Sequence, residues 1–158
     1  MLNNIKFGIK ISINNFDILP DIYNNRHLID FIEILLNPDY KIEDIEIIKK
    51  LKIPYAIHFP NSNNGIDLGD IKKNKRNIEF IKKINQDIKI LNQLNPICYI
   101  IHPESGDIDL SIKNLKIIKI KPIAIENMPV KSIYGGNLLG YDLLQILECR
   151  EKVLSFLI

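Results

Sequence analysis

The chain has 158 residues, of which 46% are hydrophobic and 25% are charged, and its formal net charge is +2. It is therefore long enough for one ordinary globular domain with a sizeable core. The net charge is too small to indicate a nucleic-acid-binding protein by itself, and two cysteines are too few for a disulfide framework. No segment has the roughly eighteen consecutive apolar residues of a membrane-spanning helix.

The cysteines and the N-terminus indicate the compartment in which such a protein works. Cys98 lies in an apolar run and Cys149 in a run of helical spacing, and both fit reduced residues of a cytoplasmic protein. Residues 1–10 contain no long apolar stretch of the kind that a signal peptide has. We therefore expect a soluble cytoplasmic protein with no membrane partner.

Short apolar runs rich in isoleucine alternate along the chain with longer segments of helical spacing. The short runs predict strands that are buried on both faces, because they are β-branched and continuously apolar. These runs are residues 5–13, 31–36, 55–59, 97–101, 123–125 and 153–158. Apolar residues at helical spacing predict helices over residues 19–28, 42–51, 78–91, 110–118 and 141–149. This alternation predicts a parallel α/β domain.

Two architectures fit this order of elements, namely a doubly wound sheet and a parallel (β/α) barrel of the TIM-barrel kind. The first predicted strand is followed by Asn14, Asn15, Phe16 and Asp17. A nucleotide-binding doubly wound fold would carry its glycine-rich phosphate-binding fingerprint at that point. The sequence therefore weakly disfavours the doubly wound fold and leaves the barrel as the better interpretation.

Three predicted strands end directly before a residue of a metal-ligand type. These residues are His58, His102 and Glu126. In a parallel barrel all the carboxyl ends of the strands lie on one face, so the three side chains should converge there. Imidazole nitrogens and carboxylate oxygens are ligands of zinc and related ions. A third histidine, His27, lies beside Arg26 in a predicted helix or loop, and we expect it at the surface.

Short motifs surround these three residues and follow one another along the chain. They are AIHFP at residues 56–60, IHPESG at 101–106, IEN at 125–127 and GGNLLG at 135–140, with IEI at 32–34 before them. AIHFP resembles the motif on strand three of the endonuclease IV family, and IHPESG and IEN resemble its motifs on strands four and five. GGNLLG resembles the glycine-rich loop after strand five of that family. That family belongs to the xylose-isomerase-like barrels, and IEI resembles a run common across that superfamily. The resemblance covers essentially the whole chain.

The resemblance implies a metal-dependent reaction. In the family, the histidines of strands three and four help to bind a metal cluster, and the glutamate of strand five bridges metals. By position these roles fall to His58, His102 and Glu126, with Glu126 as the catalytic candidate. The implied activity is hydrolysis of a phosphodiester at an abasic site in DNA, with zinc as the expected cofactor.

Neighbouring polar residues could orient these ligands. Asn127 and Ser105 lie within these motifs and could orient a metal ligand by hydrogen bonds to its side chain, although Asn127 also suits a turn. Glu104 departs from the family, which has a small residue at this point of the motif. It would add a negative charge near the metal or point to solvent.

The resemblance also implies that part of a barrel is missing. The family takes further ligands from strands six to eight, whereas this chain ends at Ile158, within or just after its sixth apolar run. Six parallel strands cannot close into the eight-stranded form, which leaves apolar edges. We therefore expect one incomplete domain over residues 1–158, with about six of the eight βα units. A second chain such as a homodimer partner could complete it, the sheet could rearrange, or the sequence could be shortened from a longer protein.

Three functions remain open at this point. The first is an endonuclease IV-like phosphodiester hydrolase that binds DNA with abasic sites, and the sequence leaves open whether this chain is active without a partner or the missing strands. The second is a sugar isomerase or epimerase of the same superfamily, for which manganese is the expected metal. The third is a non-catalytic half-barrel that serves as an interaction module. A basic cluster at residues 72–76 fits either a solvated helix face or a rim that attracts phosphate.

Overall fold

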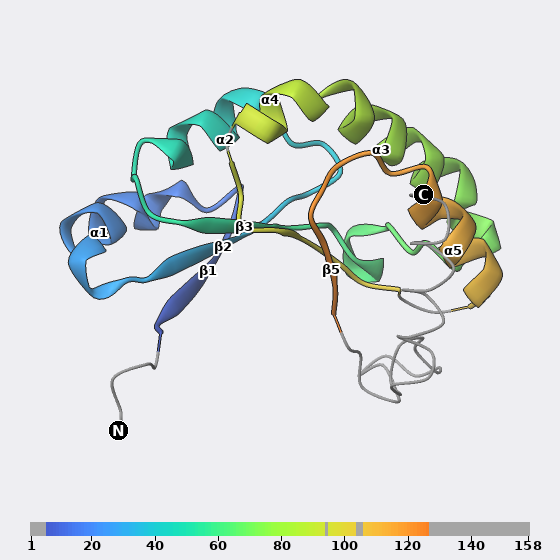
Figure 1. Cartoon of the computed structure of the whole chain (residues 1–158), viewed down its shortest axis with the longest axis horizontal. Coiled ribbons are helices and arrows are strands. Elements are labelled where there is room, and N and C mark those ends of the chain that lie inside the picture. Colours follow the sequence, from blue (N-terminus) through green and yellow to red (C-terminus); the bar gives the residue numbers. More distant parts are fainter. Residues whose placement is uncertain (1–5, 94, 104–105, 127–158) are drawn as a thin grey trace.

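The computed structural model describes residues 6–93, 95–103 and 106–126. They form a five-stranded, all-parallel sheet with helices between its strands (Figure 1). The strands are β1 (Gly8–Ser12), β2 (Phe31–Leu35), β3 (Tyr55–His58), β4 (Tyr99–Ile101) and β5 (Ile123–Ile125). Each lies within a run predicted from the sequence, so the parallel α/β fold is confirmed for this part of the chain.

The strands are arranged in sequence order, β1-β2-β3-β4-β5. Among the described strands the order never reverses, whereas a doubly wound sheet reverses at its ligand-binding switch point. The predicted helix at 141–149 and the predicted strand at 153–158 lie outside the described residues. The described sheet therefore has the strand order that a (β/α) barrel requires for its first five strands.

Five α-helices connect these strands and form an arc over one side of the sheet (Figure 1). They are α1 (Leu19–Asn24), α2 (Ile42–Lys49), α3 (Asn74–Gln86), α4 (Ile88–Gln93) and α5 (Ile108–Lys116). Three short 3-10 turns lie next to these helices, η1 (Phe16–Ile18), η2 (Arg26–Leu28) and η4 (Ile71–Lys73), and a fourth, η3 (Ser62–Asn64), lies in the loop after β3. No helix in the described part of the chain is long and apolar enough to cross a membrane.

The helix predicted over residues 78–91 differs from the structure. It begins earlier, at Asn74, and it is divided into α3 and α4 at Asp87. The carboxylate of Asp87 accepts hydrogen bonds from the Tyr40 hydroxyl at 2.6 Å and from Lys83 Nζ at 3.2 Å. The backbone of Asp87 has ψ of 0°, which departs from the regular α-helical value of about −42°. Tyr40 lies far away in sequence, so helical periodicity could not reveal this break.

The prediction that every strand is buried on both faces is wrong for most of the described sheet. Only β3 is buried throughout, whereas β2 and β4 alternate between buried and half-buried residues. The buried face packs against helix residues to form the core. Its residues on the strands or directly after them are Ile11, Ile13, Ile32, Ile34, Leu36, Tyr55, Ile57, Phe59, Tyr99 and Ile101. The opposite face, which we call the open face, carries the alternate residues and is only partly covered by the described chain.

One buried hydroxyl gives a test of this core. The Tyr99 side chain is fully buried, and its hydroxyl has no hydrogen-bond partner among the described residues. Burial raises the pKa of Tyr99 to about 12, with a further contribution from Tyr55. We expect Tyr99→Phe to leave the free energy of unfolding unchanged or to raise it by about 1 kcal/mol, because an unpaired buried polar group costs stability.

Urea denaturation of the two proteins measures this difference, and Tyr40→Phe is the matched control. The Tyr40 hydroxyl donates to Asp87, so its removal should lower the free energy of unfolding by about 1–2 kcal/mol. Equal losses in the two variants would show that the Tyr99 hydroxyl does have a stabilising partner.

Candidate metal centre

Strand ends place the three predicted ligands on the open face of the sheet. His58 is the last residue of β3, and His102 and Glu126 directly follow β4 and β5. Side chains alternate between the two faces of a strand. The residues before the three ligands are Ile57, Ile101 and Ile125, which lie on the buried face or pair in register with a residue of that face. Because side chains alternate, the ligands that follow them point to the open face.

Backbone pairing continues past the strand ends and fixes these positions. Phe59 N donates to Ile100 O at 2.9 Å, and Glu126 N donates to Ile101 O at 3.1 Å. Phe59, directly after His58, and Glu126 itself therefore still belong to the hydrogen-bonded sheet. This makes the separation of the ligands a property of the sheet rather than of mobile loops.

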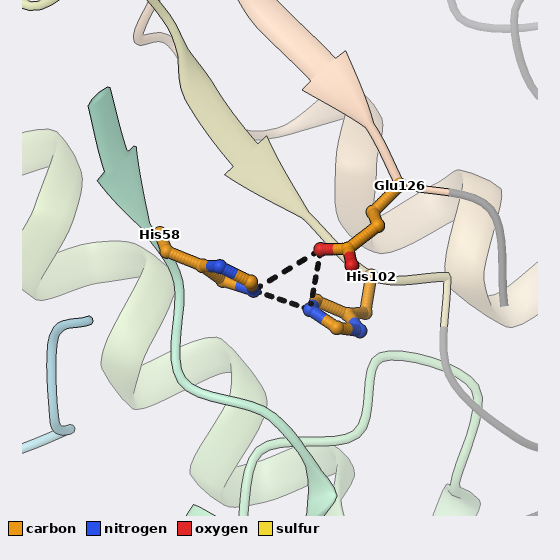
Figure 2. Close-up of side chains that lie close together, drawn as sticks. All are labelled: His58, His102 and Glu126. Atoms are coloured by element: carbon orange, nitrogen blue, oxygen red, sulfur yellow. Dashed lines mark hydrogen bonds and ion pairs between the residues drawn. The ribbon is translucent and has the colours of Figure 1, made fainter. Parts of the chain in front are cut away.

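The three side chains meet at one point (Figure 2). Glu126 Oε2 lies 3.5 Å from His58 Nε2 and 3.2 Å from His102 Nε2. The two Nε2 atoms contact each other directly, and the imidazole rings stack with their centroids 4.6 Å apart. One donor atom from each residue lies within 4.8 Å of the others. The predicted convergence of His58, His102 and Glu126 is confirmed.

The donor set fits one divalent ion such as zinc. A tetrahedral zinc ion with ligands at about 2.0–2.2 Å holds its ligand atoms roughly 3.3–3.6 Å apart. Both distances from Glu126 Oε2, 3.5 Å and 3.2 Å, are close to that range, whereas the two Nε2 atoms are in direct contact and would separate when an ion binds between them. When two neutral imidazoles face each other through Nε2, they form a hydrogen bond only if one Nε2 carries a proton and donates it. A metal cation can instead bind the lone pairs of both nitrogen atoms. The side chains can therefore hold a metal, whose identity the donor set leaves open among zinc and related ions.

Burial keeps His102 in the form that binds a metal. His58 is 1% exposed and His102 is 9% exposed, while the Glu126 side chain is 42% exposed. Burial lowers the pKa of His102 to about 4, and the neighbouring His58 and Lys10 lower it further, while Glu33 acts in the opposite direction. His102 is therefore neutral near pH 7. The exposed carboxylate marks the side from which a ligand or water can enter.

Sequence reasoning missed two charged residues beside this centre, Lys10 of β1 and Glu33 of β2. Glu33 Oε1 lies 2.5 Å from His58 Nδ1 and 2.6 Å from Lys10 Nζ, and Lys10 Nζ lies 3.0 Å from His58 Nδ1. Burial raises the pKa of Glu33, but hydrogen bonds and charges of Lys10 and His58 outweigh it, so the pKa is lowered overall. The sequence did contain a sign of these residues, because each apolar run is interrupted by one charged side chain, Lys10 in IKI and Glu33 in IEI.

Loops that leave the centre are held by buried polar side chains. Asn77 of α3 bonds both the backbone N and the backbone O of Asp67, at 3.1 Å and 2.5 Å. Ser111 of α5 donates to Pro103 O at 2.9 Å, immediately after His102. Asp107 N donates to Gly69 O at 2.9 Å, which joins the loop after β3 to the loop after β4. These bonds give the site a fixed surrounding.

The other predicted site residues have different outcomes. Ser105, Asn127 and Glu104 lie outside the described residues, as do the loop at 135–140 and Cys149. His27 is exposed in η2, as predicted, and takes no part in the centre. Cys98 is a free, half-buried cysteine.

Comparison of the chain with models of protein families, with curated proteins and with solved structures finds no match. The resemblance to the endonuclease IV family therefore rests on the short motifs and on the place of their residues in the sheet.

Proposed function

We propose that this chain is a metal-dependent phosphodiester hydrolase of the endonuclease IV type, built on a (β/α) barrel and acting on DNA at abasic sites. The observation that supports it most is the convergence of two buried imidazoles and a carboxylate from three successive parallel strands. The carboxyl edge of a parallel sheet is where such enzymes carry their active sites.

The ligands have distinct roles in this proposal. His58 and His102 would hold zinc through their imidazole nitrogens, and their burial excludes competing water from that side. Glu126 would hold it through its carboxylate, which is the exposed member of the group. Zinc in such a site makes water more acidic and withdraws charge from a phosphoryl oxygen. Histidines at the ends of both β3 and β4 favour this activity over sugar isomerisation. The sugar isomerases of the superfamily resemble this chain only at the glutamate of strand five.

Positive charge at the same edge supports a nucleic-acid substrate. The basic cluster, Lys72, Lys73, Lys75 and Arg76, lies in η4 and the start of α3, directly after the loop from β3. Connections from parallel strands leave the sheet at one edge, and the bond between Asp107 and Gly69 holds this loop beside the next one. The cluster is therefore on the side of the metal centre, where lysine and arginine could contact phosphates.

Metal analysis and a cleavage assay test this proposal. We expect about one zinc per chain by elemental analysis, with the oligomeric mass measured by light scattering on the same sample. We also expect cleavage of a duplex with one abasic site, no cleavage of the intact duplex, and loss of cleavage in a chelator. Zinc without cleavage would instead support an isomerase or an interaction module. A chain without metal would contradict the proposal at its first step.

A further inference from the structure

The contacts around His58 extend beyond the ligands themselves to β2. Glu33 pairs in register with Ala56, two residues before His58 on the same face of β3. Its carboxylate crosses to the Nδ1 side of the His58 ring, opposite the Nε2 atom that faces His102 and Glu126. The Glu33 side chain is 23% exposed and the His58 side chain 1%, so this contact is largely shielded from water.

The contact with Glu33 determines which nitrogen of His58 carries the proton. An ionised carboxylate only accepts hydrogen bonds. At 2.5 Å from Glu33 Oε1, His58 Nδ1 must therefore carry a hydrogen and donate it. Nε2 is then left with its lone pair directed at the metal centre. Lys10 Nζ also lies 3.0 Å from Nδ1, and Lys10 and His58 both contact the same carboxylate oxygen, Glu33 Oε1.

We propose that Glu33 is the positioning residue of the metal centre, which holds the His58 imidazole in the tautomer and orientation that present Nε2 to the ion. This inference rests on the proposed metal site. A metal-binding histidine commonly donates its other ring N–H to a carboxylate, and loss of that partner weakens metal binding by about 10- to 100-fold. Lys10 has the opposite effect, because it competes with His58 for Glu33 Oε1 and repels a cation.

A simpler reading is that Lys10, Glu33 and His58 only balance charge on the open face. The two readings predict different results for matched variants. If the cluster is only structural, removal of either charged partner disturbs His58 similarly. If Glu33 positions His58, its loss weakens zinc binding, whereas loss of Lys10 does not.

Zinc titration of the full chain with a competing chelator distinguishes these readings. We expect Glu33→Ala to weaken zinc binding by about 10- to 100-fold. Glu33→Gln keeps an oxygen that can accept from Nδ1, so it should bind within a few-fold of the wild type. Lys10→Met should bind zinc as tightly as the wild type or more tightly. An equal loss in Lys10→Met and Glu33→Ala would overturn the inference.

The state of the His58 ring gives a readout that needs no metal. In the metal-free chain, nitrogen NMR of the imidazoles should show Nδ1 protonated and Nε2 unprotonated, and this preference should be lost in Glu33→Ala. A proton on Nε2 in the wild type would overturn the inference. Wild-type affinity in Glu33→Ala would also overturn it while leaving the metal site intact, whereas a wild type that binds no zinc would overturn the metal site and the positioning role together.

Discussion

Replacing His102 by alanine should abolish zinc binding at ordinary micromolar concentrations. The centre offers one donor atom from each of three residues, so the variant would hold the ion through His58 and Glu126 alone. Zinc-binding free energies of about 10–16 kcal/mol for four-ligand sites correspond to roughly 3 kcal/mol for each ligand. One ligand therefore contributes on the order of 100-fold or more in affinity. Elemental analysis after dialysis and a chelator titration measure the loss.

His27→Ala is the matched control for this prediction. His27 is the same residue type, but it is exposed in η2 and takes no part in the centre. Its replacement should leave both the zinc content and the affinity unchanged. If His102→Ala retained the zinc stoichiometry of the wild type, the metal would be bound elsewhere and the assignment of His102 would be wrong.

The part of the site that could be predicted from the sequence is the set of residues at the ends of the strands. Isoleucine-rich runs predict parallel strands almost by themselves, because β-branched side chains pack well in sheets. Three of these runs lead directly into a residue of a metal-binding type, and parallel pairing brings those strand ends to one edge of the sheet. His58, His102 and Glu126 could therefore be assigned to a common site without any distance information.

The neighbours of that site could not be predicted in the same way. Continuous apolarity suggested strands buried on both faces, so Lys10 and Glu33 had no evident role. Their meaning depends on the open face of the sheet and on the register that places Lys10 beside Glu33. The break at Asp87 has a similar origin, since its partner Tyr40 lies in another βα unit. In each case a long-range contact overrides a local pattern.

Asn77→Ala should cause the largest loss of stability among polar substitutions near the site. Asn77 is fully buried, and its amide bonds the backbone N and O of Asp67. Alanine would leave both backbone groups buried without these partners, at about 1–3 kcal/mol each before relaxation. We expect the free energy of unfolding to fall by about 2–4 kcal/mol, because water can replace only part of what is lost. Urea denaturation followed by circular dichroism measures it.

Asn85→Ala provides a control on the same helix with the same chemistry. The Asn85 amide donates to Ile117 O at 2.7 Å and accepts from Lys119 N at 2.9 Å, but both bonds are exposed to solvent. Water can take over these bonds, so the loss should be about 1 kcal/mol or less. Equal losses in the two variants would mean that burial is not what makes Asn77 important. A much larger loss for Asn77 would show that its buried amide is a main support of the loop leaving His58, and hence that α3 helps to keep the metal centre in shape.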